Sequence, residues 1–390
     1  MSRLLIPASV SASRALELLP LLEAALAGDG PAIAPTDPAA RVASGAGGEV
    51  PDDVAVVLRT SGSTGASRAV MLGSRALHAS AEATARALGS TAGGRTQWLL
   101  ALPAVHVAGV QVLVRSALAG TVPAVVDLAD GFRAASFAET TETMTGDRRH
   151  TSLVPTQLVR LLDDPDGMRA LRSFDAVLLG GAATTTTLLA RAHDAGVRAV
   201  TTYGMTETCG GCVYDGTPLD GVRVDLDAEG RILLGGPVLA TGYLGRPDLD
   251  AEAFVTRHGE RWLRTSDLGE LDETGRLRVT GRVDDVIITG GVKVSPAAAE
   301  HVLAEIDGVA EVCVVGLPDD EWGQSVTAAL VLRPGATAPT LATVRAAVAA
   351  RLGAPSAPRG VVVVGSLPLR GPGKPDRSAV AALARDLLAH

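Results

Sequence analysis

The stretch 54-VAVVLRTSGSTGASRAV-70 joins an apolar run to a loop of small hydroxyl residues and glycines. The valine-rich run over residues 54–59 predicts a β-strand. Glycines allow the loop to curl so that its backbone N–H groups converge on one anion, and the serine and threonine hydroxyls add donors. The loop therefore indicates a phosphate-binding segment, with an ordinary Ser/Gly turn as the alternative. It is not a P-loop, because Gly62 and Gly65 are too close together and no lysine follows them.

The chain continues as an alternation of strand-like and helix-like segments. Further strands are predicted over residues 97–102, 122–128, 174–180 and 197–204, and helices over residues 74–89, 107–119 and 184–196. This alternation is typical of a layered α/β domain with largely parallel strands. Residues 30–53 are rich in Gly, Pro and Ala, so we expect a loop or a poorly ordered connection there.

Two changes of pattern divide the rest of the chain. After about residue 215, short strands separated by the turn-forming pieces DAEG and DETG predict a small antiparallel β subdomain. From Val283 onward, strands and helices follow in a new order, which predicts a separate α+β domain. The predicted domains are therefore residues 1–281, with layered α/β sheets and the small β subdomain, and residues 282–390.

Composition excludes several classes of protein. A formal net charge of −8 argues against a nucleic-acid-binding protein, which would usually present a basic face. No run of apolar residues is long enough for a membrane-spanning helix, and the N-terminal residues predict a strand and an amphipathic helix rather than a signal peptide. Three cysteines are too few for a disulfide framework in 390 residues. A cytoplasmic protein is the expectation.

Six motifs follow one another along the chain. They read 60-TSGSTGASRAV-70, 180-GGAAT-184, 203-YGMTET-208, 265-TSDLGEL-271, 281-GRVDDVIITGGVKVSP-296 and 371-GPGKPDRS-378. In this order, the motifs resemble those of the adenylate-forming acyl-CoA synthetase family, which includes nonribosomal adenylation domains and luciferases. Each motif alone is weak, whereas six in the right order and approximate spacing are specific.

The resemblance implies a two-step reaction. A carboxylate attacks the α-phosphate of ATP to give an acyl adenylate and pyrophosphate, and a thiol then displaces AMP. ATP, Mg²⁺ and coenzyme A are the implied cofactors, and a small-molecule carboxylic acid is the implied substrate. The C-terminal domain is implied to be a mobile lid that turns about a hinge at Asp284.

The family's nucleotide-binding residues map onto this sequence position by position. The first loop would hold the β- and γ-phosphates, and Glu207 with Thr64 would bind Mg²⁺. Asp267 would accept hydrogen bonds from the ribose hydroxyls, with Arg282 beside it. The nucleotide-binding residues implied in this way are Thr60, Ser61, Gly62, Ser63, Thr64, Gly65, Gly181, Ala182, Thr202, Tyr203, Gly204, Met205, Thr206, Asp267 and Arg282.

The C-terminal domain is implied to supply a different group to each step. Lys374 matches the lysine that contacts the carboxylate and the α-phosphate, where a point charge suits the developing pentavalent centre. Gly290, Gly291 and Lys293 lie where the family passes the pantetheine arm of coenzyme A, although a simple glycine turn is equally compatible. One residue departs from the family pattern: Arg68 stands where a lysine is usual, and it keeps the charge but not the geometry.

The acid-binding residues are predicted from two further segments. The segment 102-LPAVHVAG-109 follows a strand and opens a helix, as does the family segment that lines the acyl pocket. His106 is either a catalytic and acid-binding residue or an ordinary partly buried histidine. Thr208, Cys209 and Gly210 are predicted to contact the acid, and the glycines beside Cys209 leave room for a planar ring. Thr208 and His106 are candidates for binding a second carboxylate.

The pair Cys209 and Cys212 also allows a zinc-binding or redox module as a competing hypothesis. Zinc needs four ligands, and no second cysteine pair or His-x₃-His sequence supplies them. Structural or pocket-lining cysteines are therefore favoured.

Within this family, the segment 203-YGMTETCGGCVYDGTPLDGV-222, the GGAAT element and the compact length resemble ligases that activate a ring-bearing keto diacid and transfer it to coenzyme A. The resemblance implies that substrate class, which suits a small, flat pocket with polar groups. A general short-chain or aryl acyl-CoA ligase is one alternative. An adenylation enzyme that loads a carrier protein is another. No nucleic-acid partner and no membrane span are expected, and a homodimer is left open.

Overall fold

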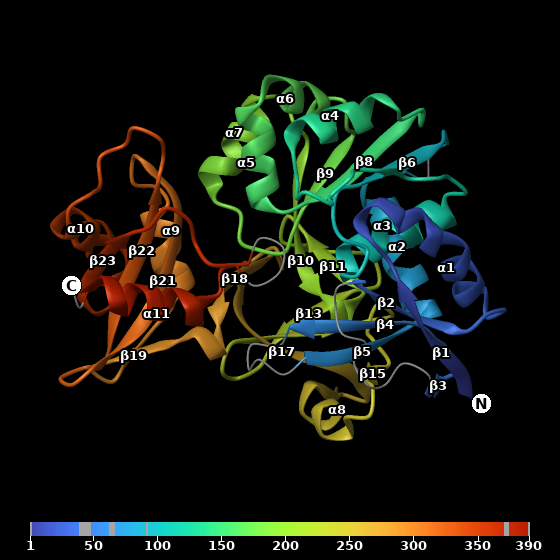
Figure 1. Cartoon of the computed structure of the whole chain (residues 1–390). Coiled ribbons are helices and arrows are strands. Elements are labelled where there is room, and N and C mark those ends of the chain that lie inside the picture. The colour runs from blue at the N-terminus through green and yellow to red at the C-terminus, as the bar shows by residue number, and fades with distance from the viewer. Residues whose placement is uncertain (1, 39–47, 62–66, 91–92, 370–373, 389–390) are drawn as a thin grey trace. The chain divides into compact units, whose positions relative to one another are not determined.

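A computed structural model of the chain describes residues 2–38, 48–61, 67–90, 93–369 and 374–388 (Figure 1). Contacts between residues divide the chain into two compact units. The first consists of residues 1–225, 233–264 and 273–277, and the second of residues 226–232, 265–272 and 278–390. The predicted division between residues 281 and 282 stays a prediction.

The first unit opens with a six-stranded mixed sheet in the order β15-β5-β4-β2-β1-β3. Its strands are β1 (Ser2–Ser9), β2 (Ala32–Thr36), β3 (Glu49–Pro51), β4 (Val54–Ser61), β5 (Ser67–Gly73) and β15 (Gly242–Tyr243). The expectation of a loop or poorly ordered connection over residues 30–53 is wrong for β2 and β3. Ala32 and Ile33 are almost fully buried, because β2 lies between β1 and β4 and pairs in parallel with both.

Strands β4 and β5 lie on either side of the Ser/Thr/Gly loop in the sequence and pair with each other. Strands β4 and β5 are antiparallel, and Thr60 is opposite Arg68 in their register. The predicted phosphate-binding residues Gly62, Ser63, Thr64 and Gly65 lie outside the described residues.

A second, seven-stranded sheet has the order β12-β11-β10-β9-β8-β6-β7. Its strands β6 to β10 are all parallel to one another. This confirms the predicted layered α/β fold. The strands are β6 (Thr96–Leu100), β7 (Ala124–Val125), β8 (Arg148–Leu153), β9 (Ala176–Leu179), β10 (Ala199–Met205), β11 (Gly210–Tyr214) and β12 (Thr217–Pro218).

Helices form layers on both faces of this sheet. Helix α2 (Ser74–Ala87) contacts strands of both sheets, and α3 (Val107–Leu118) contacts strands of the seven-stranded sheet. Helix α1 (Leu18–Ala27) follows the short helix η1 (Ala12–Glu17) and contacts β2, β4 and α3. The other face is covered by α4 (Ala134–Glu142), α5 (Pro155–Asp163), α6 (Pro165–Leu171) and α7 (Thr186–Asp194) (Figure 1). Their core centres on the fully buried Phe137, beside Leu158, Leu171 and Phe174.

Short strands with tight turns follow, as predicted for the antiparallel β subdomain. They are β13 (Arg223–Leu226), β14 (Arg231–Gly235), β16 (Phe254–Arg257), β17 (Glu260–Leu271) and β18 (Leu277–Arg282), with helix α8 (Pro247–Ala253) before β16. The short helices η2 (Thr206–Thr208) and η3 (Val283–Asp285) follow β10 and β18 along the chain.

The C-terminal part of the second unit has the predicted α+β composition. Its sheet has the order β20-β19-β22-β21, and β23 pairs in parallel with β22. The elements are β19 (Ile287–Thr289), β20 (Val292–Val294), α9 (Pro296–Leu303), β21 (Val309–Asp319), β22 (Gly323–Leu332), α10 (Leu341–Leu352), η4 (Ala354–Ser356), β23 (Gly360–Val363) and α11 (Arg377–Leu388).

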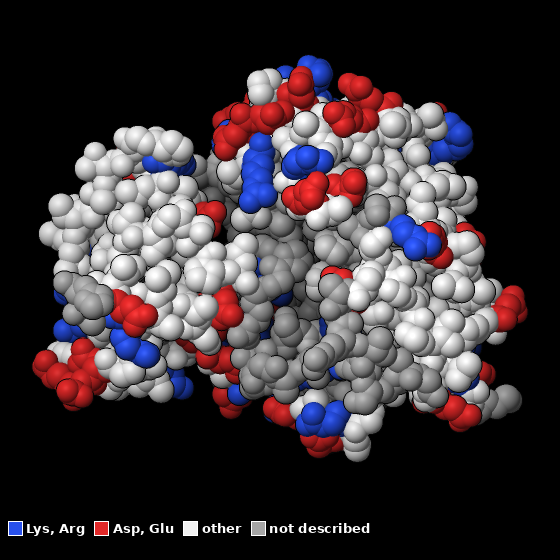
Figure 2. All heavy atoms as spheres, in the orientation of Figure 1, with Lys and Arg blue, Asp and Glu red and all other residues white. Residues whose placement is uncertain are grey.

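Acidic and basic side chains are interspersed on the face of the molecule in Figure 2. No helix within the described part of the chain is long and apolar enough to cross a membrane.

A buried histidine in β8 gives the first unit a predictable response to pH. His150 is fully buried, its ring centroid lies 5.1 Å from that of Trp98, and its Nε2 is 2.9 Å from Ser90 Oγ. Burial lowers the pKa of His150 to about 4, and nearby arginines add to the shift against the opposing charge of Asp175. Between that pKa and the ordinary value near 6.5, the unfolded chain binds more protons than the folded chain.

We therefore expect the unfolding free energy to fall by about 2 kcal/mol from His150 alone when the pH drops from about 8 to about 5. Urea unfolding at the two pH values measures this, and His150→Asn should remove that part of the pH dependence. An unchanged pH dependence in His150→Asn would contradict the assignment.

Candidate active site

Two neighbouring parallel strands bring predicted nucleotide-binding residues together. Gly180 and Gly181 directly follow β9, and Thr202 lies near the end of β10, which pairs with β9. The Thr202 hydroxyl donates to the carbonyl of Leu179 at 3.0 Å, and a Cβ at Gly180 would lie 2.6 Å from Thr202 Oγ1. The carboxyl ends of adjacent parallel strands are the usual ligand-binding edge of such a sheet.

One position near the end of β10, Gly204, has no room for a side chain. A Cβ at Gly204 would lie 2.1 Å from the carbonyl oxygen of Gly210, in the neighbouring strand β11. Gly204 therefore permits the close pairing of β10 with β11, which places Tyr203 and Met205 beside the turn that follows.

That turn, η2 with Cys209, carries Glu207 and is held by its own hydrogen bonds. The backbone N–H of Met205 donates to Thr208 Oγ1 at 2.9 Å, and the Thr208 hydroxyl donates to the carbonyl of Gly210 at 2.8 Å. Thr208 is fully buried, so its hydroxyl serves the turn. Its predicted contact with a second carboxylate stays a prediction.

Side chains from two helices bind the backbone at the end of the turn. Cys209 has φ 52° and ψ 34°, a left-handed conformation that is uncommon for a residue with a side chain. Its carbonyl accepts hydrogen bonds from Ser80 Oγ of α2 at 3.1 Å and from Gln111 Nε2 of α3 at 2.8 Å. All three residues are buried, so these bonds compensate for the unusual backbone conformation.

Glu207 contacts a residue that the sequence motifs did not reveal. The Tyr243 hydroxyl donates to Glu207 Oε1 at 2.8 Å, and burial together with Glu207 raises the pKa of Tyr243 above its usual range. The Arg68 guanidinium lies 5.9 Å from the centroid of the Tyr243 ring. Tyr243 reaches this position because β15 pairs with β5, where Tyr243 is opposite Val70.

The residues around Glu207 suit Mg²⁺ bound mainly through substrate phosphates. Within the part of the chain that the structure describes, no three His, Cys, Asp or Glu side chains form a cluster that could hold a metal. Mg²⁺ is usually bound by one or two carboxylates, water and substrate phosphates, so the single carboxylate of Glu207 fits it. The second predicted ligand, Thr64, lies outside the described residues.

The predicted acid-binding segment faces the start of α3. A Cβ at Gly210 would lie 3.5 Å from Gln111 Cγ and 3.9 Å from Val107 Cγ2. His106 is the N-cap residue of α3 and is partly exposed. Gly210 is buried and packs against the first turns of the helix that His106 opens, and its predicted contact with the acid stays a prediction.

The two cysteines of this segment are inaccessible. Both are fully buried, and burial raises the pKa of the Cys212 thiol to about 12. Burial and the neighbouring Cys212 raise the pKa of the Cys209 thiol further. Thiolates are the forms that bind metals and react, so the structure disfavours the zinc or redox hypothesis.

The second unit brings the predicted ribose-binding pair together. Arg282 Nη1 donates to Asp267 Oδ1 at 2.5 Å, and Arg282 Nη2 donates to Asp284 Oδ2 at 3.4 Å. Asp267 is buried, and its backbone N–H donates to Thr265 Oγ1 at 3.0 Å. The predicted hinge residue Asp284 lies in η3, directly after this pair.

The glycines predicted to pass the pantetheine arm form the hairpin turn between β19 and β20. Gly290 and Gly291 have φ of 55° and 78°, which a two-residue hairpin turn of this kind requires. The Gly290 N–H donates to the carbonyl of Trp322 at 2.9 Å, and a Cβ at Gly290 would lie 2.6 Å from the Trp322 ring. Lys293 on β20 is exposed, as is Lys374 before α11.

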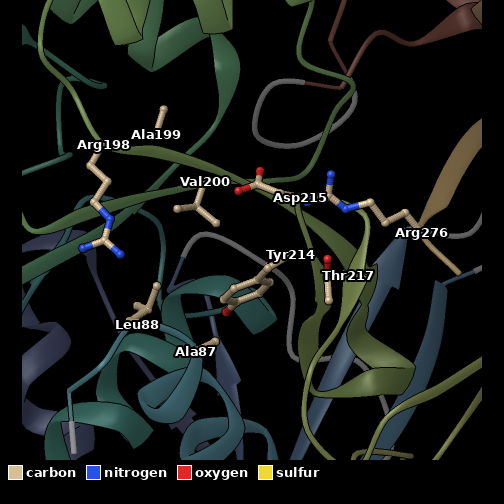
Figure 3. A pocket seen from close by; sticks show the side chains of 9 residues that line it. All are labelled: Ala87, Leu88, Arg198, Ala199, Val200, Tyr214, Asp215, Thr217 and Arg276. Carbon is tan, nitrogen blue, oxygen red and sulfur yellow. The ribbon is translucent and has the colours of Figure 1, made fainter. Parts of the chain in front are cut away.

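A separate pocket of about 410 Å³ lies near the start of β10, away from Glu207 along the strand (Figure 3). Tyr214 and Val200 form part of its wall, and Arg198, Asp215 and Arg276 contribute charged side chains. Asp215 accepts from the N–H and the hydroxyl of Thr201, both at 2.8 Å. None of the predicted site residues lines this pocket.

Layered α/β sheets followed by a small α+β part, with Glu207 at the carboxyl edge of the parallel strands, define the class of adenylate-forming enzymes. The chain belongs to the AMP-binding enzyme family, whose model matches residues 29–244. The model of the AMP-binding enzyme C-terminal domain matches residues 298–374.

Three relatives illustrate the similarity. A probable 2-succinylbenzoate–CoA ligase of Mycobacterium tuberculosis (strain CDC 1551 / Oshkosh) is 44% identical over 368 residues, which cover 93% of this chain and 94% of that protein. The structure of O-succinylbenzoate coenzyme A synthetase from Bacillus subtilis, in complex with ATP and magnesium ion, has a TM-score of 0.70, 26% identity and coverage of 95% of this chain and 82% of that one. The amide bond synthetase McbA from Marinactinospora thermotolerans has a TM-score of 0.76, 28% identity and coverage of 97% and 80%.

The burial of the thiols leads to a prediction about their reactivity. Cys209, Cys212 and Cys313 are all buried, so iodoacetamide at about pH 8 should leave them unmodified in the folded protein and modify all three in urea. Mass spectrometry measures the modification. Val122→Cys, at a position that is 60% exposed, is the control that should react at once. Rapid modification of Cys209 or Cys212 in the folded protein would contradict their structural role.

Proposed function

We propose that this chain is an ATP-dependent acid–thiol ligase that activates 2-succinylbenzoate as an acyl adenylate and transfers the acyl group to coenzyme A. AMP and pyrophosphate are the other products, and the reaction belongs to menaquinone biosynthesis. The observation that carries the proposal is the 44% identity, over 94% of that protein's length, to a probable 2-succinylbenzoate–CoA ligase. The position of Glu207 at the end of β10, where Tyr243 binds it, supports the proposed nucleotide-binding edge.

The proposed substrate follows from the relatives. The 44% identity to the ligase of Mycobacterium tuberculosis supports 2-succinylbenzoate as the acid. His106 is the proposed contact for its second carboxylate.

In the first step, an oxygen of the succinyl carboxylate forms a bond to the α-phosphorus of ATP, and the bond to the pyrophosphate oxygen breaks. Bound Mg²⁺ neutralises charge on the triphosphate. Glu207, held by Tyr243, is its proposed ligand, and Lys374 supplies a positive charge near the α-phosphate. Arg68, close to Tyr243, adds a second positive charge beside the phosphates.

In the second step, the sulfur of coenzyme A bonds to the acyl carbon and AMP leaves. We propose that the C-terminal domain first turns about Asp284, so that the hairpin of Gly290 and Gly291 replaces Lys374 at the site. Asp267 and Arg282 keep hold of the ribose. The cytoplasm is the proposed location and a homodimer the proposed assembly.

Pyrophosphate release with ATP and Mg²⁺, measured across a panel of acids with and without coenzyme A, tests the proposal. We expect turnover with 2-succinylbenzoate that depends on coenzyme A, and no turnover with acetate, benzoate or fatty acids. Lys374→Ala is the matched control: it should abolish pyrophosphate release but still convert supplied acyl adenylate to the thioester. Broad activity on simple acids would overturn the proposed substrate, and turnover that needs a carrier protein would overturn the proposed acceptor.

A further inference from the structure

Three residues after Lys374, a single arginine binds three elements of the second unit. Arg377 Nε donates to Asp285 Oδ2 at 3.0 Å, and Nη1 and Nη2 donate to the two carboxylate oxygens of Glu300 at 2.5 and 3.0 Å. Nη1 also donates to the carbonyl of Val314 at 2.7 Å. The Arg377 side chain is only 27% exposed, so solvent screens these charge-assisted bonds incompletely.

The partners of Arg377 come from different parts of the fold. Asp285 is the last residue of η3 and directly follows the proposed hinge residue Asp284. Glu300 lies on α9, and Val314 lies in the middle of β21. One guanidinium therefore joins the turn after the hinge to the body of the C-terminal domain.

The residues between Lys374 and Arg377 are also fixed. Pro375 forms a β-bridge with Leu369, and the backbone N–H of Asp376 donates to the carbonyl of Pro368 at 2.8 Å. Asp376 Oδ1 accepts from the N–H of Ser378 at 3.2 Å and of Ala379 at 3.3 Å, in the first turn of α11. Lys374 therefore directly precedes a segment whose backbone is held by these hydrogen bonds.

We propose that Arg377 is a positioning residue for adenylation: its bonds to Asp285 and Glu300 fix Lys374 relative to the turn that follows the hinge. A rotation at Asp284 then delivers the Lys374 ammonium to one defined place. This inference rests on the roles proposed for Lys374 and Asp284. It assigns Arg377, Asp285 and Glu300 a role that the sequence motifs did not indicate.

The geometry requires arginine rather than any cation. Glu300 accepts two parallel hydrogen bonds from one planar guanidinium, while the Nε of the same group reaches Asp285. A lysine ammonium has no such fork and can satisfy one carboxylate only by leaving the other. Arg377→Lys therefore keeps the charge but loses the link between η3 and α9.

Two variants separate positioning from mere stabilisation of the fold. Asp285→Ala removes only the bond on the hinge side and leaves the bidentate bond to Glu300, so the domain should stay folded. Arg377→Lys weakens both sides. Arg345→Lys is the matched control, because Arg345 is a partly buried arginine of the same unit that bonds to the carbonyl of Pro358 instead.

The experiment measures ATP–pyrophosphate exchange, thioester formation from supplied acyl adenylate, and the thermal midpoint of each variant. We expect kcat for exchange to fall about tenfold to a hundredfold in Asp285→Ala and Arg377→Lys, with the KM for ATP nearly unchanged, because misplacement of a catalytic group by about 1 Å has such an effect. Thioester formation should change less than about twofold, and Arg345→Lys should behave as wild type. Equal losses in both half-reactions, or unchanged exchange in both variants, would overturn the proposal.

Amide hydrogen exchange supplies a readout that does not depend on catalysis. Asp285→Ala should speed exchange in a peptide covering residues 374–380 as well as in one covering residues 283–290, whereas Arg345→Lys should affect neither. Unchanged exchange in the first peptide would overturn the proposed link. A wrong acid or thiol acceptor would appear instead in the wild-type panel and would leave this result standing.

Discussion

The left-handed backbone at Cys209 is the constraint on which the site depends. It reverses the chain between β10 and β11, so that Glu207 stands at the edge of the sheet and Gly210 begins the next strand. The conformation is held by hydrogen bonds to one carbonyl from α2 and α3, two helices that pack against the seven-stranded sheet. The layered packing therefore sets the position of the acidic turn, and the small residues around it allow β10 and β11 to approach closely.

The acidic turn also brings together side chains from the two sheets of the first unit. Glu207 is fixed by Tyr243, which comes from β15 of the other sheet, and Arg68 lies close to that tyrosine. Gly210 lies directly after the acidic turn and packs against the first turns of α3. In the second unit, the buried Asp267 accepts a hydrogen bond from Arg282, and backbone hydrogen bonds hold the residues that follow Lys374. In the proposed reaction, each step would use a different face of the C-terminal domain.

Much of the fold could be predicted from the sequence because its core strands and amphipathic helices are strongly patterned. The strand over residues 54–59, the helix over residues 74–89 and the tight turns of the β subdomain are present as predicted. Strand β2 was missed because Ala and Pro are poor strand formers, and its neighbours β1 and β4 impose the extended conformation. Tyr243 could not be predicted, since its contact with Glu207 arises from the pairing of strands far apart in the sequence. Gln111 and Ser80 lie on ordinary helices, where no local pattern distinguishes a side chain that bonds to a distant carbonyl.

A crystal structure of the protein with ATP, Mg²⁺ and 2-succinylbenzoate tests the central claim most directly, namely that the acidic turn at the end of β10 binds the nucleotide and that the helix opened by His106 borders the acid. The account predicts a magnesium ion about 2.1 Å from a Glu207 carboxylate oxygen and in contact with the phosphates. It also predicts the acid, or its adenylate, in contact with His106. A metal bound away from Glu207, or an acid bound away from His106, would contradict the account.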